Sequence, residues 1–433
     1  MAPTGLDTIE KAATTRWGAA VSRPAGPSDE IGTRRPTIVL EPTDVPMLAD
    51  MLRWANAERL AVVPRGAGTK LAWGRTPARV DAVLSTVRLH APIEHVAGDL
   101  TATVSAGTSL AELNAVLGRE GQWLPLDPRL ADRATIGGVV ATNDSGPRRL
   151  KHGTPRDLII GVEMALADGR TAKAGGRVVK NVAGYDLARL LCGSFGSLAV
   201  ITRATFKLAP LPRGSRTVVA ADREARPLAD LALAFVSSAL TPTAIELQSH
   251  TPRLLVRFET TDAAANQQAS AAQHLCGSRR VEASIVSGDA EAGLWRDYQR
   301  DLAGDPGERG ALVRIAVLPT QVPDMIGHVA RVALQHTLEC RVAGRAALGV
   351  LYVRIGGAEK SRPAPESAAA AVDAFRKNAW ARGGSAVVVS ADPAVAALID
   401  PWGDVGDALP VMRAVKARFD PNAILVPGRV PWS

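Results

Sequence analysis

Small residues occupy most positions of a long stretch from Ala134 to Gly146, and this stretch limits the possible fold more than any other feature of the sequence. Gly137 and Gly138 remove side chains, so a bulky ligand can approach the backbone there. Hydroxyl and amide groups that can bond phosphate, ribose or ring edges come from Thr135, Thr142, Asn143 and Ser145. We expect Asp127, which precedes a proline, to shape the entry to this stretch. The alternative is a helix that packs tightly on glycine.

A second glycine-bearing loop follows directly on a strand-like run. It reads Pro64-Arg65-Gly66-Ala67-Gly68-Thr69-Lys70. Its two glycines allow close approach and positive φ, so consecutive backbone N–H groups can point at one anion. The loop is predicted to hold a pyrophosphate, the alternative being a plain turn after a strand. Its spacing matches neither a Walker loop nor a Gly-x-Gly-x-x-Gly dinucleotide loop.

Strand and helix patterns alternate along the chain and predict an α+β fold. The first is a strand–helix–strand unit over residues 37–63, with Asp44 as the N-cap of its helix. Thr108 is expected to cap a helix over 110–117, and Asp168-Gly169 to turn a hairpin. Prolines at 210 and 212 favour an extended linker.

Four segments follow from these patterns. Residues 1–33 lack periodicity and are expected to form a flexible arm, the alternative being a loosely packed helix that ends at Gly26-Pro27. A ligand-binding domain is expected over 34–212. Residues 213–400 alternate strands and helices as in a ferredoxin-like α+β cap, and 401–433 form a tail that returns to the first domain.

Composition narrows the classes of function. Cys192, Cys276 and Cys340 lie far apart, which argues against a disulfide framework, a structural zinc site and an iron–sulfur cluster bound by this chain. The net charge of +8 is scattered and is not interleaved with aromatic residues, so no nucleic-acid partner is expected. Neither a signal peptide nor a stretch of about eighteen apolar residues is present, so we expect a cytoplasmic protein that meets a membrane only through partners.

A third segment, Lys180 to Leu190 with Gly193-Ser194, repeats the small and polar character. The three segments together resemble the FAD-binding PCMH-type domain of the vanillyl-alcohol-oxidase superfamily. The third is similar to the FAD-binding (E) subunits of bacterial glycolate oxidases. The resemblance runs from about Arg35 to the C-terminus and is strongest over Pro125–Pro212. It implies an FAD-binding domain of two subdomains and a redox flavoprotein.

The resemblance assigns parts of FAD to residues. Pro64–Lys70 would hold the pyrophosphate, and Ile136–Gly146 with Gly153 would line the pyrophosphate, ribitol and flavin ring. Backbone groups of Val200 and Ile201 would lie near the adenine.

The resemblance also bears on how the flavin is attached. Some relatives link it covalently through a His beside the first loop or a Cys near the second. This chain has Thr69-Lys70 and Thr142-Asn143-Asp144 there, so the resemblance implies non-covalent FAD. His152 is expected to pack beside the flavin without a linkage.

Oxidation of a 2-hydroxy acid by flavin needs a base, a hydride acceptor and usually an arginine for the carboxylate. Arg314 and Arg354, in strand-like runs, and Arg429, in the tail, are candidates, the alternative being an exposed strand face. The related catalytic subunits carry a His-rich metal motif, whereas the histidines of this cap are isolated, so no metal is assigned. The tail reads Val426-Pro427-Gly428 where the family has Asn-Pro-Gly, which predicts an altered flavin surrounding.

The leading hypothesis is an FAD subunit of a glycolate-oxidase-like 2-hydroxy-acid dehydrogenase. Its substrate would be glycolate or D-lactate, and its partners a catalytic flavoprotein and an iron–sulfur subunit. One alternative is a self-sufficient oxidase or dehydrogenase of a hydroxy acid, sugar alcohol or aldonolactone. Another is a non-enzymatic assembly subunit.

Overall fold

The computed structural model describes residues 6–177, 184–303, 310–357 and 362–433, and its contacts divide the chain into two compact units. The first unit runs up to Ser145 and includes Gly153–Leu211 and Asp404–Ser433. The second consists of Gly146–His152 and Pro212–Gly403. The divisions at Leu211 and Gly403 lie beside the boundaries expected at 212 and 400.

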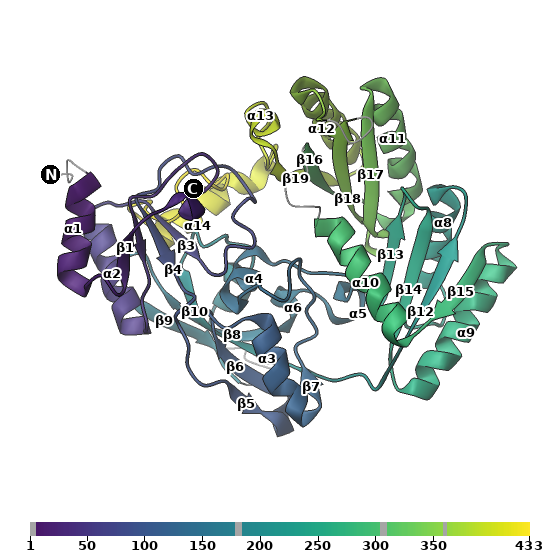
Figure 1. The fold of residues 1–433 in the computed structure, drawn as a ribbon, viewed down its shortest axis with the longest axis horizontal. Coiled ribbons are helices and arrows are strands. Elements are labelled where there is room, and N and C mark those ends of the chain that lie inside the picture. The colour runs from purple at the N-terminus through teal and green to yellow at the C-terminus, as the bar shows by residue number, and fades with distance from the viewer. Residues whose placement is uncertain (1–5, 178–183, 304–309, 358–361) are drawn as a thin grey trace. The chain divides into compact units, whose positions relative to one another are not determined.

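The first unit begins with a four-stranded sheet of order β1-β2-β4-β3 (Figure 1). Its strands are β1 (Ser22–Pro24), β2 (Ile38–Leu40), β3 (Val62–Arg65) and β4 (Ala82–Ser85), and α1 (Leu6–Trp17) and α2 (Val45–Ala57) pack on it. The side chain of Asp44 caps α2 by accepting a hydrogen bond from the Met47 N–H, as predicted. Both β2 and β3 run parallel to β4.

The N-terminal segment differs from the flexible arm expected over residues 1–33. Strand β1 pairs with β2, and Ile9, Ala13 and Val21 are buried in the same core as residues of α2. These apolar residues are too sparse to form a periodic pattern, and only their burial against α2 reveals the helix.

A second sheet of the first unit has the order β5-β6-β10-β8-β9 and is antiparallel throughout. Its strands are β5 (Glu94–Val96), β6 (Thr101–Ser105), β8 (Ile159–Ala165), β9 (Thr171–Gly175) and β10 (Val200–Lys207). Helices α3 (Leu110–Leu117), α4 (Ile136–Thr142), α6 (Pro155–Leu158) and α7 (Leu187–Leu191) accompany it, and β7 (Gln122–Trp123) pairs with β11 (Ala209–Pro210). Ser109, and not the expected Thr108, caps α3. Residues 180–183 of the third predicted segment lie outside the described residues.

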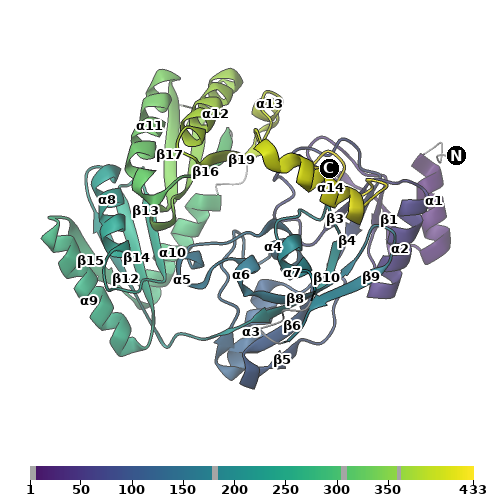
Figure 2. The same cartoon turned by 180° about the vertical axis from the view of Figure 1, so that it is seen from behind.

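The tail returns to the first unit. Helix α14 (Leu409–Phe419) leads to Leu425, which bridges to Val62 of β3, and the Val62 N–H donates to the Ile424 carbonyl at 2.7 Å (Figure 2). The Lys416 ammonium is buried below this bridge and donates to the carbonyls of Ser197 and Leu425, both at 2.8 Å.

The second unit is one antiparallel sheet of order β15-β12-β14-β13-β17-β18-β16-β19. Its first half is β12 (Gly214–Ala221), α8 (Ala225–Val236), β13 (Ala244–Gln248), β14 (Arg253–Thr260), α9 (Asp262–Ser278) and β15 (Glu282–Val286). Its second half is β16 (Ala311–Ala316), α11 (Val322–Gln335), β17 (Leu338–Arg345), β18 (Val350–Gly357), α12 (Pro365–Trp380) and β19 (Ser385–Ala391). Each half is a βαββαβ unit, which confirms the ferredoxin-like cap. Helices α5 (Arg149–His152), α10 (Gly288–Ala303) and α13 (Pro393–Ala396) complete the unit.

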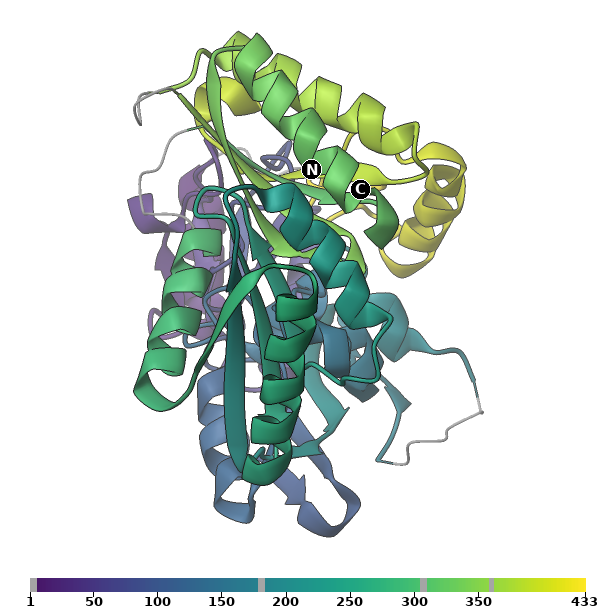
Figure 3. The same ribbon diagram turned by 90° about the vertical axis from the view of Figure 1, so that its right-hand side faces the viewer.

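The two faces of this sheet differ in chemistry. Helices α8, α9, α11 and α12 cover one face, where they bury apolar side chains such as Val218, Leu247 and Val353 (Figure 3). Because side chains alternate along a strand, the neighbouring residues point to the opposite face. That face is polar and carries, among others, Glu246 and Thr217, which bond Tyr298 and Trp295 of α10.

Candidate cofactor site

A cavity in the first unit brings together segments far apart in the sequence. It is lined by Val63 to Leu71, by Thr86, by residues of α4 and its N-cap, by Phe195 to Gly196, by Ala199 to Ile201 and by Arg429. Thirteen of the predicted cofactor residues are among them: Pro64, Arg65, Gly66, Ala67, Gly68, Thr69, Lys70, Thr135, Gly137, Gly138, Thr142, Val200 and Ile201.

The two glycine loops face each other across this cavity. Gly66 lies so close to Thr135 that a Cβ at position 66 would stand 2.0 Å from the threonine Oγ1. Gly68 has a φ of +76°, which a side chain would strain. The strand β3 thus delivers a backbone turn directly against the N-terminal end of α4, and a ligand between them meets little more than main chain.

A buried ion pair joins the same two loops. The Lys70 Nζ lies 3.4 Å from Asp144 Oδ2, and both side chains are less than a tenth exposed. Asp144 Oδ2 also accepts from the Arg129 N–H at 3.0 Å, and Lys70 donates to the Arg129 carbonyl. Burial lowers the pKa of Lys70, and the Asp144 carboxylate opposes this effect. Lys70 therefore adds a cation to the cavity wall.

The side chain of Arg65 pairs with Asp29 of the N-terminal segment. Its Nη1 donates to Asp29 Oδ1 at 2.8 Å, and Arg23 donates to the same carboxylate at 2.7 and 3.0 Å. The hydrogen bond from Arg23 is the largest of several effects that hold the pKa of Asp29 well below its usual range. A segment that sequence reasoning left without chemistry thus orients an arginine of the cavity.

Replacing Asp29 by Asn is expected to weaken cofactor binding about tenfold, a loss of about 1.4 kcal/mol, because Arg65 loses its charged partner. The measurement is a titration of the apoprotein with FAD, followed by the quenching of flavin fluorescence. Glu30→Gln is the matched control, because Glu30 pairs only with the exposed Arg35 in the described chain. Equal affinities of the two variants would contradict this role of Asp29.

Arg429, expected as a catalytic candidate, holds the first loop. Its Nη2 donates to the carbonyls of Leu71 and Trp73 at 2.6 and 3.0 Å and approaches that of Lys70 at 3.4 Å. Burial lowers its pKa to about 10. The guanidinium of Arg429 thus ties the C-terminal segment to the end of the first loop.

The other predicted cofactor residues do not line the cavity. Asp127, Ile136, Asn143, Ser145 and Gly153 lie in the first unit but outside the lining. Ile136 is buried in the core, and Asn143 ends α4 with a φ of +50°. Gly146 and His152 belong to the second unit.

Sequence reasoning missed several lining residues. They are Val63, Leu71, Thr86 and Phe195, whereas Ala141, Gly196 and Ala199 lie within the segments expected at the cofactor. Phe195 and Gly196 both have positive φ, and the Gly-Ser-Phe-Gly sequence around them was the available signal. No sequence motif marks Thr86. It reaches the cavity because it follows β4, which pairs with β3.

The folding stability of the second unit is expected to depend on pH because of His152. Burial, with help from Lys151 and Arg148, lowers its pKa from 6.5 to about 4. Between pH 6.5 and 4 the unfolded chain therefore binds a proton that the folded chain does not, and folding stability should fall as the pH falls through this window. Denaturation at pH 7 and pH 4.5 should show a larger loss for the wild type than for His152→Gln. Parallel losses would contradict the prediction.

The cavity has the chemistry that FAD requires. Glycine backbone on two sides admits a bulky ring system and a pyrophosphate, and Arg65 and Lys70 supply positive charge beside it. Residues 36–175 match the family model of the FAD binding domain, and residues 215–430 match that of the FAD linked oxidases, C-terminal domain. The chain is an FAD-linked oxidoreductase.

Relatives of this flavoprotein include two glycolate oxidase subunits. It is 27% identical to glycolate oxidase subunit GlcD of Bacillus subtilis over 421 residues, which cover 91% of this chain and 89% of that protein. It is 37% identical to glycolate oxidase subunit GlcE of Escherichia coli over 170 residues, or 39% of this chain and 48% of that one. A crystal structure of p-cresol methylhydroxylase with substrate bound has the same fold, with a TM-score of 0.76 at 14% identity over 99% of this chain and 97% of that chain. The PCMH-type expectation for the flavoprotein is confirmed.

Arg314 and Arg354 lie in the second unit. They share the polar face of the sheet, because Arg314 is paired with Tyr352 of β18 and Arg354 with Leu312 of β16. Arg341 of β17 is paired with Arg354 and extends the group. Within the described ranges of the flavoprotein, no group of three or more His, Cys, Asp or Glu side chains could hold a metal ion, and no helix is long and apolar enough to cross a membrane.

Proposed function

We propose that this flavoprotein is the FAD-bearing component of a 2-hydroxy-acid dehydrogenase that acts on glycolate or D-lactate and passes electrons to a partner. The proposed partners are a catalytic flavoprotein and an iron–sulfur subunit. The names of GlcD and GlcE support both the substrate class and the role as a subunit. The proposed localisation is cytoplasmic, with membrane contact only through partners.

The observation that carries the proposed substrate class is the group of Arg314, Arg341 and Arg354 on one sheet face. The side chain of Arg314 is half-buried and makes no hydrogen bond or ion pair with the described residues. A guanidinium in that state favours a carboxylate ligand, because paired N–H groups match its two oxygens. In the proposed reaction Arg314 binds and orients the carboxylate of the substrate.

Residues of the first unit would bind FAD, the acceptor of the hydride. FAD, when bound, supplies the acceptor for the hydride that leaves the hydroxyl-bearing carbon. Residues Pro64–Lys70 and Thr135–Thr142 would hold it, with Arg65 and Lys70 beside its anionic part. The closed first loop, held by Asp29 and Arg429, keeps these donors in place.

The test is the visible spectrum of the purified protein before and after addition of substrate. The purified chain should be yellow, and under anaerobic conditions glycolate or D-lactate should bleach its flavin slowly alone and rapidly once partner subunits are added. A colourless protein after incubation with FAD would contradict the flavin role. Absence of bleaching by any 2-hydroxy acid, even with partners, would contradict the substrate class.

Arg314→Met should weaken the binding of glycolate, seen as a shift of the flavin spectrum, by about 10- to 100-fold, as expected for a lost charged hydrogen bond. Arg331→Met is the control, because Arg331 is exposed on α11, which covers the opposite face of the sheet. Similar affinities of both variants would contradict the role of Arg314.

A second candidate is a self-sufficient dehydrogenase. It is favoured by the match to probable mitochondrial D-lactate dehydrogenase of Danio rerio, whose name gives no subunit and which is 24% identical over 95% of this chain and 88% of that protein. The same experiment separates the two, because this candidate requires rapid bleaching by substrate without partners.

A further inference from the structure

The chain leaves the first unit after Ser145 and returns to it at Gly153. The residues between these points, Gly146–His152, belong to the second unit, and we call them the strap. The strap continues directly from the glycine-rich stretch whose Gly137 and Gly138 line the cofactor cavity. The second unit therefore holds a segment that is covalently joined, at both ends, to the unit that binds FAD.

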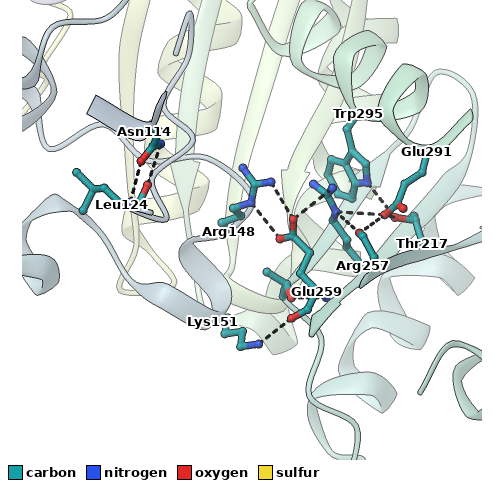
Figure 4. A network of polar contacts seen from close by, with 11 residues as sticks. Asn114, Leu124, Arg148, Lys151, Thr217, Arg257, Glu259, Glu291 and Trp295 are labelled. Atoms are coloured by element: carbon teal, nitrogen blue, oxygen red, sulfur yellow. Dashed lines mark hydrogen bonds and ion pairs between the residues drawn. The ribbon is translucent and has the colours of Figure 1, made fainter. Parts of the chain in front are cut away.

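Four hydrogen bonds fix the strap, and Figure 4 shows those of Arg148 and Lys151. Arg148 donates from Nε and Nη2 to the two carboxylate oxygens of Glu259, at 3.0 and 2.8 Å, and Lys151 donates to the Glu259 carbonyl at 3.1 Å. At the start of the strap, the Gly146 carbonyl accepts from Arg345 Nε at 3.0 Å. Bidentate pairs of this kind are strong and fix orientation.

Glu259 is built into the sheet as an anchor. It lies in β14, its side chain is 4% exposed, and Arg257 approaches the same carboxylate at 3.2 Å. Burial opposes its ionisation, but the hydrogen bonds and charges of Arg148 and Arg257 outweigh burial and leave the pKa of Glu259 below its ordinary value. The folded protein thus favours the ionised form of this carboxylate, which pairs with Arg148 of the strap.

We propose that Glu259 is a positioning residue for FAD, which acts by gripping Arg148 and so holding the end of the glycine-rich stretch in its FAD-binding conformation. The stretch ends in Asn143, at a φ of +50°, and Asp144, which pairs with Lys70 of the cavity. A released strap gives these residues conformational freedom that FAD binding must then remove, at a cost in affinity. The proposal depends on the FAD site and not on the proposed substrate.

The test is the affinity of the full-length apoprotein for FAD, measured by the quenching of flavin fluorescence. Arg148→Met should weaken FAD binding about tenfold, and Arg148→Lys should recover part of the loss. Glu259→Gln should weaken binding in the same direction. Arg148→Met is the cleaner variant, because Glu259 keeps Arg257 as a partner and the sheet stays intact.

Glu291→Gln is the matched control. Glu291 is a buried carboxylate of the same network, bonded to Ser215, Thr217 and Arg257, and Figure 4 shows it on the side of Arg257 away from the strap. Its loss should reduce the stability of the second unit and leave FAD affinity unchanged.

Hydrogen exchange provides a second readout. Backbone amides of residues 137–145 in the apoprotein should exchange faster in Arg148→Met than in the wild type or in Glu291→Gln. Wild-type affinity and exchange in Arg148→Met would overturn the proposal. An equal loss of affinity in Glu291→Gln would also overturn it, since FAD binding would then follow the general stability of the second unit.

Discussion

Replacing Lys416 by Met should lower the free energy of unfolding of the first unit by about 3–5 kcal/mol, the cost of leaving a buried charge without its partner. Lys416 is 4% exposed and lies 2.6 Å from Asp420, which is 1% exposed. Asp420 also accepts from the N–H groups of Ile424 and Leu425. The substitution leaves this carboxylate buried and removes donors from the carbonyls of Ser197 and Leu425.

The measurement is urea denaturation followed by a probe of the first unit. Arg418→Met is the control, since Arg418 is exposed on the same helix and should change stability by less than about 0.5 kcal/mol. The double variant Lys416→Met with Asp420→Asn should lose less than Lys416→Met alone, because no unpaired charge remains. A double variant that loses the sum of both single losses would contradict the buried pair.

Replacing Gly66 by Ala should weaken FAD binding about 100-fold. The new Cβ would lie 2.0 Å from Thr135 Oγ1 and 3.2 Å from Thr135 Cβ, so the two loops of the cavity must separate. Overpacking of this kind costs about 1–3 kcal/mol, and here the strain falls on the groups that line the cavity. The affinity is measured by FAD titration of the apoprotein.

A double variant tests the cause of this loss. Thr135→Ala removes the hydroxyl oxygen that the new Cβ at position 66 would meet first, so adding it to Gly66→Ala should recover most of the affinity. Gly98→Ala is the control, because nothing lies within 4 Å of a Cβ at that position. An unrescued double variant would contradict the clash between position 66 and the Thr135 hydroxyl as the cause of the loss.

Several parts of the molecule could be predicted because their signals are local. Asp44 caps α2 as expected, and the hairpin between β8 and β9 turns at Asp168-Gly169. The two glycine loops line one cavity, and their signal is local because close approach of a ligand to the backbone favours positions without side chains. The second unit was assigned the correct architecture from alternating elements, although β15, α10, β17 and β19 were not predicted.

Three of the missed elements, β15, α10 and β17, share one physical reason. Strand β17 carries Arg341 and Arg345 on the polar face of the sheet, and β15 is an edge strand with exposed residues, so neither forms an apolar run. Helix α10 has few apolar residues and is held by Trp295 and Tyr298 through polar contacts. Such elements gain their stability from contacts with distant segments, which a local pattern does not contain.

The sequence by itself determined that this chain has two glycine-rich backbone segments, an α+β fold and the chemistry of a flavin site. Only the tertiary structure decided which side chains serve that site. It placed Arg429, a catalytic candidate, on carbonyls of the first loop, joined Asp29 of the expected arm to Arg65, and brought Arg314 and Arg354 to one sheet face. Charged side chains look alike in a sequence whether they are solvated or buried, because their partners lie hundreds of residues away or on another strand.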